Sequence, residues 1–464
     1  MSENEKKKLY KQLIRETSRE FLLERMRLHG FWPSGEALPE VPPEEAEERA
    51  AVEKELRALR EQFAAVQDPE KALAEERKRR WEGSKKRRAE RKAEREAVAR
   101  ERRERWEQKR QEKLVHLGEG VSAGLGHEST ESDEPRLTEL GLPVMHTGEE
   151  LAAALEIDLP TLKWLTYHRR GAALVHYHRY QIPKKTGGMR RISAPKPTLA
   201  RAQRWVLDAI LAQVETEPEA HGFVQNRSIV TNAAHHVGQN IVANLDIKDF
   251  FPSFGFRRVK GLFHKRFGYS EHVATALTLL CTEPPRLEAR FDGRRIWVAL
   301  GERFVPQGAA TSPAITNLLS QRLDRRLAGA ARTQDYVYTR YADDLTFSGS
   351  DVENLGKLLR LVRHIIADEG LEEHEAKTRV MRRSSRQEVT GVTVNDKLAL
   401  SRAEFRKLRA ILHNCERRGL QSQNRAGHPN FAAFLRGKVA FSHMVAPERT
   451  AELWAALERA LAKG

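Results

Sequence analysis

The sequence predicts an α+β fold that is preceded by a helical N-terminal extension. Residues 1–117 are dominated by Lys, Arg, Glu and Ala in helical patterns. From about residue 175, short runs rich in β-branched and aromatic residues alternate with amphipathic helical patterns. The last 65 residues are again helical in pattern and basic. Strands are therefore expected only in the middle of the chain.

The composition predicts a polyanionic partner. The 464 residues include 81 Lys and Arg against 65 Asp and Glu, a formal net charge of +16, which makes nucleic acid or an anionic membrane surface the leading candidate partners. No apolar run approaches the length of a membrane span, and the N-terminus lacks the apolar segment of a secretory signal. Cys281 and Cys415 suggest neither a disulfide framework nor a zinc site. We expect a cytoplasmic protein with no membrane partner.

The extension, residues 1–117, holds much of the positive charge. Its stretch from Glu76 to Lys113 contains 18 Lys or Arg and 9 Glu, a balance of +9 in 38 residues. The few apolar residues there cannot bury a core, so we expect a solvated helix that either contacts nucleic acid or serves only as a solubilising segment. The Gly-, Ser- and acid-rich residues 118–136 are predicted to be a linker.

Three segments follow the linker. Residues 137–175 predict a small helical unit, in which Thr147 and Glu150 have the spacing of a capping box. Residues 176–240 begin with a strand-turn-strand pattern around Gly187–Gly188 and continue into a helix, "PTLARAQRWVLDAILAQV". Residues 241–395 mix strands and helices, and residues 396–464 are helical.

Within 241–395 the elements can be placed in order. The apolar strand "IVANL" ends at Asp246, and "SPAITNLLSQRLDRRLAGAA" predicts one long helix with Ser312 as its cap and Pro313 in its first turn. "RYADDLTF" predicts a tight hairpin with Asp343 and Asp344 at its tip, followed by a helix, "VENLGKLLRLVRHIIADEG". "EVTGVTVNDKLAL" predicts a second hairpin with Asn395–Asp396 as its turn.

Three of the acids in this region form a candidate metal site. Asp246 lies at the end of one strand, and Asp343 and Asp344 lie at the tip of the hairpin. Two divalent cations held by acids from neighbouring strands can activate a hydroxyl nucleophile and stabilise a leaving pyrophosphate. Taken singly, each acid is equally explained as a turn or capping residue. The order of further motifs decides between these interpretations.

The chain resembles the reverse transcriptases. "LDIKDFFPSF" looks like their first catalytic motif, "VPQGAATSP" like their second and "YADD" like their third, in the expected order over about residues 170–400. The resemblance implies a right-hand polymerase, with fingers (176–240), a palm with an antiparallel sheet and a finger insertion (241–395) and a helical thumb (396–464). RNA-directed DNA synthesis is the implied activity, a nucleotidyl transfer with deoxynucleoside triphosphates as substrates.

Finer features resemble one branch, the bacterial retron reverse transcriptases, in its larger form with an N-terminal extension. "NAAHH" looks like the branch's Asn-Ala-x-x-His motif, and Val389–Thr390–Gly391 like its second marker. By resemblance, Asp246, Asp343 and Asp344 are the catalytic acids and hold two Mg²⁺ ions per active site. Asp343 is the stronger ligand of its pair, and the carbonyl of Ile247 is an expected further ligand.

The same resemblance implies a nucleotide-binding set. Phe251 looks like the aromatic gate that excludes a ribose 2′-hydroxyl, although a core aromatic beside Phe250 is the alternative. Gln307 and Gly308 are expected to approach template and nucleotide, and Asp249 to contact the triphosphate through its backbone. The remaining members are cations: Lys184, Lys185, Arg190 and Arg191 around the predicted turn, with Arg190 as first choice, and Lys377 as a proton donor to pyrophosphate. The alternative for Lys184 and Lys185 is that they are exposed surface charges without a role in nucleotide binding.

The predicted RNA-binding residues lie in two groups. Asn232 and His236 belong to the retron marker. A metal role for His235 and His236 is rejected because neighbouring side chains point apart and no acid or Cys completes a site. A histidine pair of this kind is usually structural or forms hydrogen bonds with RNA. The second group consists of exposed basic residues of the thumb, each of which has the alternative of being a solvated charge: Arg402, Arg406, Lys407, Arg409, Arg417, Arg418, Arg436 and Lys438.

The implied function is therefore that of a retron polymerase. It would copy its cognate structured noncoding RNA, starting from the 2′-hydroxyl of an internal guanosine, into a branched RNA–DNA product called msDNA. A role in antiphage defence with a separate effector protein is also implied. The alternatives are a group II intron-type or other bacterial reverse transcriptase, and a nonenzymatic RNA-binding protein on a palm scaffold, which would be expected to have lost an acid or the Gln307–Gly308 loop.

Overall fold

The structure is a computed structural model that describes residues 3–16, 19–32, 35–37, 43–65, 69–112, 117–118, 121, 131–184 and 187–462. Most of the predicted linker and Lys185 lie outside these residues. The chain divides into two compact units, Met1–Arg103 and Glu104–Gly464, which are described separately.

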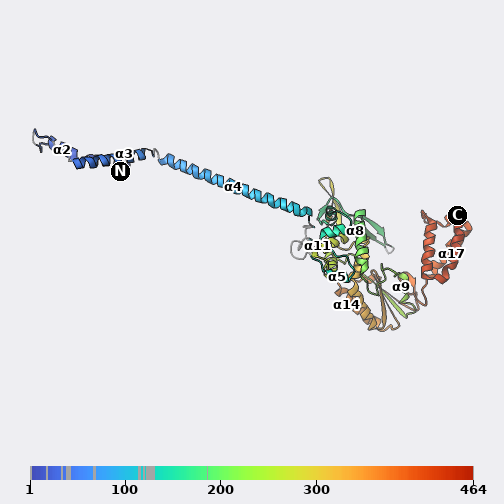
Figure 1. Cartoon of the computed structure of the whole chain (residues 1–464). Helices are drawn as coiled ribbons and strands as arrows, with labels where there is room; N and C mark the ends of the chain where they lie inside the picture. Colours follow the sequence, from blue (N-terminus) through green and yellow to red (C-terminus); the bar gives the residue numbers. More distant parts are fainter. Residues whose placement is uncertain are drawn as a thin grey trace. The chain divides into compact units, whose positions relative to one another are not determined.

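The N-terminal unit is built from helices, as predicted. They are α1 (Glu3–Glu16), α2 (Arg19–Leu28), α3 (Pro43–Ala65) and α4 (Pro69–Glu112), the last of which continues beyond the unit boundary. Figure 1 draws α4 as one unbroken helix in light blue. Nearly all its described side chains are exposed, and pairs such as Glu76–Arg80, at 2.8 Å, support the helix from its own surface.

The second unit contains thirteen named α-helices among its described residues. Several begin at a Ser, Thr or Asp whose side chain accepts a hydrogen bond from the first turn, for example Thr147 before α6 and Ser270 before α11. The helices are α5 (Glu134–Glu139), α6 (Gly148–Ala154), α7 (Leu159–Thr166), α8 (Pro197–Ala209), α9 (Ile229–Ala234), α10 (Phe256–Gly261), α11 (Glu271–Cys281), α12 (Ser312–Leu319), α13 (Gln321–Arg332), α14 (Leu355–Asp368), α15 (Arg402–Arg418), α16 (Phe431–Val445) and α17 (Pro447–Ala462).

In the described residues of this unit, the strands pair in four antiparallel sheets. The largest has the order β7-β8-β4-β9, and the others are β1-β6-β5, β2-β3 and β10-β11. The strands are β1 (Gly171–Ala172), β2 (Tyr177–Pro183), β3 (Met189–Pro195), β4 (Ile241–Asp246), β5 (Arg286–Phe291), β6 (Arg294–Ala299), β7 (Tyr336–Tyr341), β8 (Asp344–Gly349), β9 (Arg379–Arg382), β10 (Glu388–Val389) and β11 (Val392–Thr393). This mixture of helices and antiparallel sheets confirms the α+β prediction.

Three local predictions need correction. The predicted linker 118–136 extends too far, because Ser132 is buried and Asp133 caps α5. The predicted long helix is two helices, α12 and α13, separated at Ser320, whose N–H is shared between the carbonyls of Thr316 and Asn317, a pattern common at helix ends. Ser312 is the first residue of α12 and not its cap.

The second hairpin turns earlier than predicted. Strands β10 and β11 are joined by Thr390 and Gly391, both of which have positive φ, 48° and 85°. Such a turn matches the twist of a two-residue hairpin. Asn395 has a different role, because its side chain accepts from the Gln387 N–H and donates to the carbonyls of Arg383 and Ser385. Its side chain thus links the residues after β11 to the turn before β10 and does not form the hairpin turn.

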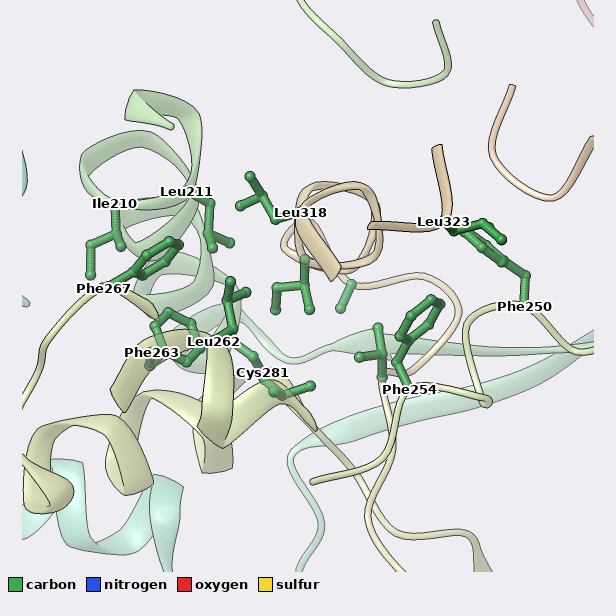
Figure 2. Packing of buried hydrophobic residues seen from close by; sticks show 14 of the residues in the cluster. Ile210, Leu211, Phe250, Phe254, Leu262, Phe263, Phe267, Cys281, Leu318 and Leu323 are labelled. Atoms are coloured by element: carbon green, nitrogen blue, oxygen red, sulfur yellow. The ribbon is translucent and has the colours of Figure 1, made fainter. Parts of the chain in front are cut away.

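The main core packs helices against the β7-β8-β4-β9 sheet. Figure 2 shows part of it, where Phe254 and Phe263 from the segment after β4 belong to the same cluster as Ile210 and Leu318. A second core holds α15, α16 and α17 together, and includes Leu412, Leu435 and Leu457. A third, smaller core joins α9 to the β10-β11 hairpin. The two retron-like markers of the sequence thus pack against each other.

Candidate active site

The three predicted catalytic acids come from adjacent strands of one sheet. Asp246 is the last residue of β4, and its register partner across the antiparallel pair is Asp344, the first residue of β8. Opposed Cα atoms in such a pair are about 4.5–5.5 Å apart. Asp343 lies in the two-residue turn before β8, and its carbonyl accepts a hydrogen bond of 2.9 Å from the N–H of Ile247. The sheet therefore brings together acids that are far apart in the sequence.

The acids perturb one another electrostatically. The pKa of Asp344 is raised to about 7. Loss of solvent is the largest cause, and the negative charges of Asp343 and Asp246 add to it, although part of the residue remains exposed. Burial and the charge of Asp246 also raise the pKa of Asp343, and the positive charges of Lys377 and Arg190 partly offset this. The site thus concentrates negative charge that its own cations do not balance.

One of the acids is held by a lysine. The ammonium of Lys377 donates to both carboxylate oxygens of Asp246, at 2.8 and 2.9 Å. Among the described residues, no three acidic, His or Cys side chains are already gathered closely enough to hold a metal ion. The backbone convergence predicted from the sequence is present, but the side chains are not arranged as a metal cage. Repulsion between carboxylates and the attraction of Lys377 account for this difference.

The donor set nevertheless fits a divalent cation. Carboxylate oxygens are the ligands preferred by Mg²⁺. Asp343 and Asp344 have raised pKa values that a nearby cation would lower, and the ammonium of Lys377 already provides positive charge at the third acid. Asp246, Asp343 and Asp344 are the residues that would hold the ion.

The Gln307–Gly308 loop lies against β3, the strand that contains Arg190. The N–H of Ser193 donates to the carbonyl of Gln307 at 2.8 Å. Gly308 has a φ of 115°, and a Cβ at this position would lie only 2.8 Å from Cγ2 of Ile192. Glycine is therefore required by both backbone conformation and space. The structure brings this predicted loop and strand together.

The other predicted nucleotide-binding residues have varied surroundings. The ring of Phe251 is partly buried, 5.7 Å from that of Phe250, so it keeps some exposed surface. Asp249 has a φ of 45°, and its carbonyl accepts from both the N–H and the hydroxyl of Ser253 at 3.0 Å. Lys184 is exposed beside the β2-β3 turn, where its N–H donates to the carbonyl of Gly188.

Direct RNA contact by Asn232 and His236 does not fit the structure. Their exposed fractions are 1% and 0%, so neither side chain can reach a nucleic acid on the surface. The ring of His236 lies between the hydroxyls of Ser348 and Thr339, at 2.6 and 2.7 Å, and burial lowers its pKa to about 3. His236 is thus a neutral core residue that links β7 to β8.

The basic residues predicted on the thumb are all exposed. Leu408, Leu412 and Cys415 form the buried side of α15, and the basic side chains lie elsewhere on the helix. Arg402, Arg406, Lys407, Arg409, Arg417 and Arg418 belong to α15, and Arg436 and Lys438 belong to α16. RNA contact by these residues remains a prediction.

Sequence reasoning missed the polar support of the acidic hairpin. Arg340 is fully buried in β7, and its guanidinium donates to the carboxylate of Asp324, to Asn317 and to the carbonyl of Ala342. Gly222 lies against the same turn, because a Cβ there would be 2.6 Å from the N of Ala342. A basic residue directly before "YADD" in a buried strand was the available signal; its partners could not be read from spacing.

Comparison with known proteins identifies the family. Residues 182–394 match the family model described as "Reverse transcriptase (RNA-dependent DNA polymerase)". Retron Mx65 reverse transcriptase of Myxococcus xanthus is 45% identical over 321 residues, covering 69% of this chain and 73% of that relative. The chain belongs to the retron reverse transcriptases. Retron Mx162 reverse transcriptase of the same organism is 40% identical over 354 residues, 72% of each chain. Retron Ec86 reverse transcriptase of Escherichia coli is 34% identical over 282 residues, 60% of this chain and 81% of the relative.

This retron reverse transcriptase is an RNA-directed DNA polymerase with the right-hand fold that its motifs predicted. Its relatives favour the retron branch over the group II intron-type alternative and an enzyme over a nonenzymatic RNA-binding protein. The family as a whole depends on divalent metal ions. In the part of the chain that the structure describes, no helix is both long and apolar enough to cross a membrane.

Proposed function

We propose that this reverse transcriptase joins deoxynucleotides by two-metal-ion nucleotidyl transfer at Asp246, Asp343 and Asp344. The observation that supports this most is the register pairing of Asp246 with Asp344 beside the turn that contains Asp343. When bound, two Mg²⁺ ions would lower the pKa of the attacking hydroxyl and neutralise the leaving pyrophosphate. The three acids would bind the ions, and Lys377 would then be released from Asp246.

The nucleotide-binding residues would hold the triphosphate and select the sugar. Arg190, on β3, is near enough for its positive charge to offset part of the rise in the pKa of Asp343 and can chelate phosphate oxygens, and Lys184 can add a point charge from the hairpin turn. The partly exposed ring of Phe251 would exclude a 2′-hydroxyl, while Gln307 and Gly308 would position template and nucleotide. The backbone of Asp249 would contact the triphosphate. Lys377, once released, would donate a proton to pyrophosphate.

The proposed template is a structured noncoding RNA encoded beside the enzyme. Synthesis would begin at a guanosine 2′-hydroxyl within that RNA and yield branched msDNA. The exposed basic side chains of α15 support RNA binding in the thumb, because a row of cations can follow phosphates without reading bases. We assign residues 176–240 to the fingers, 241–395 to the palm and 396–464 to the thumb.

The resemblance to retron reverse transcriptases supports two further parts of the proposal. One is a cytoplasmic role in antiphage defence. The other is a separate effector protein that acts with the enzyme and its msDNA. Co-purification of a tagged enzyme from its host would identify such an effector.

The experiment that tests the proposal combines the protein with its neighbouring RNA, Mg²⁺ and labelled deoxynucleotides, followed by ribonuclease treatment. DNA that stays joined to an RNA remnant through a 2′,5′ linkage is the expected product. Linear DNA made only when a primer is added would reject the retron priming reaction while leaving polymerase activity intact. The Asp343→Asn/Asp344→Asn variant is expected to make no DNA and to retain RNA binding.

A further inference from the structure

A second pocket lies outside the catalytic acids, where α7 and the segment around β1 meet the end of α11 and the start of β5. It is a small hollow with an accessible volume of only about 40 Å³, so a ligand would lie across its mouth and not inside it. Its walls combine aromatic and basic side chains: Trp164, Tyr167, Arg169, His176, Arg286 and Arg303. All these residues belong to the second unit.

The pocket has an excess of positive charge. Arg286 donates to the carbonyls of Arg169, Arg170 and Trp297. Arg303 donates to the carbonyls of Leu279 and Thr282 and to the Thr282 hydroxyl. In the described part of the chain neither guanidinium has a carboxylate partner, since Glu283, the acid of the pocket wall, pairs with Arg179. Half-buried guanidinium groups without a counter-charge favour an anionic ligand.

A neighbouring histidine reports the same positive potential. The pKa of His168 is lowered to about 4. Burial is the largest cause, and the positive charges of Arg303, Arg286 and Arg170 add to it. One ring nitrogen of His168 lies 3.2 Å from a guanidinium nitrogen of Arg303, so the neutral ring can accept that hydrogen bond. A bound anion would therefore lie near a neutral His168 and the positive charges of Arg303, Arg286 and Arg170.

The rim of the pocket presents flat rings to solvent. Trp164 is 42% exposed and Tyr167 is 40% exposed. The Trp164 ring is supported by His176, with ring centroids 4.4 Å apart and planes at 83°, and a nitrogen of the His176 ring lies 2.9 Å from the Trp164 carbonyl. The guanidinium of Arg169 lies 5.2 Å from the centre of the Tyr167 ring. A cation and two aromatic rings thus occur together at the surface.

We propose that this pocket binds unpaired nucleotides of a single strand, with phosphate at Arg169 and Arg286 and a base stacked on Trp164 or Tyr167. Sites that bind single-stranded nucleic acid commonly combine cations, which contact phosphates, with exposed aromatic rings, on which any base can stack. An acidic peptide would use the cations and leave the rings without a partner. The site rests on the proposed function, since the strand would be either the template RNA or the DNA product.

The test measures affinity of the full-length chain for three fluorescein-labelled probes by anisotropy: a 12-nucleotide RNA without self-complementarity, the DNA of the same sequence, and the RNA as a blunt duplex. Trp164→Ala/Arg169→Ala changes two exposed residues. It is expected to weaken binding to at least one single strand by about tenfold or more and to alter duplex binding less than twofold. The matched control is Phe291→Ala/Arg322→Ala, which removes an exposed ring and an exposed arginine outside the pocket.

The probes also separate the two sources of the strand. A larger loss on RNA assigns the pocket to the template, and a larger loss on DNA assigns it to the product. Unchanged affinity for both single strands, or an equal loss on the duplex and on the control variant, overturns the pocket. Crosslinking of 4-thiouridine RNA provides a second readout, with the crosslinked peptide expected to contain Trp164 or Tyr167.

The same measurements in the Asp343→Asn/Asp344→Asn background keep this proposal separate from the catalytic one. Binding at the pocket does not require the acids, so the tenfold loss is expected there too. If the wild-type chain made no DNA while the pocket variant showed this loss, the proposed polymerase mechanism alone would be overturned. If the wild-type chain made branched DNA while the pocket variant showed no loss, the pocket alone would be overturned.

Discussion

Arg340 donates to both carboxylate oxygens of Asp324, from Nε to Oδ1 and from Nη2 to Oδ2, each at 2.7 Å. Both side chains are fully buried, and the remaining guanidinium nitrogen, Nη1, donates to the side-chain carbonyl of Asn317 and to the backbone carbonyl of Ala342. This pair ties the hairpin that presents Asp343 and Asp344 to α12 and α13. The turn that contains Asp343, a proposed catalytic acid, is therefore held by a buried hydrogen-bonded charge network.

Removing one partner of this pair is expected to destabilise the protein strongly. Arg340→Met leaves Asp324 buried without its counter-charge, which should lower the free energy of unfolding by about 3–5 kcal/mol in urea titrations. Arg322→Ala is the control, because Arg322 is exposed and its partner Glu369 keeps a second cation, Arg326, so the loss should be less than about 1 kcal/mol. A loss for Arg340→Met as small as that of the control would contradict the assigned role.

The two adjacent histidines of the retron marker should behave differently on substitution. His236→Ala leaves the buried hydroxyls of Ser348 and Thr339 without this partner and creates a cavity, so unfolding should become easier by about 2–4 kcal/mol. His235→Ala changes an exposed ring and should alter stability by less than about 0.5 kcal/mol. Thermal or urea unfolding measures both. If His236→Ala weakened RNA binding without any loss of stability, the structural role would be wrong.

The raised pKa of Asp344 predicts a stability that depends on pH when metal is absent. Its folded pKa of about 7 exceeds the ordinary value of 3.8, so the folded chain holds this proton more tightly than the unfolded chain does. The stability from this group is complete below about pH 4 and is lost as pH rises to about 7. In EDTA, the unfolding free energy of the wild type relative to Asp344→Asn should fall over this interval. Mg²⁺ at pH 8 should restore part of it, whereas a difference that rises with pH would contradict the assignment.

The basic part of the N-terminal extension is expected to contribute salt-dependent RNA binding. Deletion of residues 1–112 removes α4 but spares Leu117, which is buried in the second unit. The slope of log affinity against log salt concentration should become shallower, because fewer cations neutralise phosphates. Deletion of residues 1–68 is the control: this segment has 12 Lys or Arg against 15 Asp or Glu, so its loss should leave the slope unchanged. Equal slopes for all three chains would make α4 a solubilising segment.

The sequence was sufficient for features that depend on local pattern. The strand ending at Asp246, the hairpin around Asp343 and the exposed basic residues of α15 all follow from periodicity and turn chemistry, and the structure contains them. The ordered motifs predicted the family because three separate patterns had to coincide.

Features that depend on long-range packing could not be predicted. Lys377 pairs with Asp246 and Arg340 with Asp324 through contacts between segments that only the folded sheet brings together. For His236 the sequence leaves a structural role and an RNA contact both open, because the motif itself gives no sign of the burial that the structure shows. The hairpin turn was misplaced because Asn395–Asp396 is a good turn sequence, whereas Thr390 adopts positive φ against its own preference.

The most direct test of the proposed metal-binding role of Asp246, Asp343 and Asp344 is a count of bound metal ions. Mn²⁺ binding, followed by electron paramagnetic resonance in the presence of RNA and a nonreactive deoxynucleotide analogue, should give two ions per wild-type chain. Asp246→Asn should lose at least one ion or weaken binding by tenfold or more, while the control Glu372→Gln, which changes an exposed acid paired with Lys248, should bind as the wild type does. An unchanged number and affinity of ions in Asp246→Asn and in Asp343→Asn/Asp344→Asn would contradict the role assigned to these acids.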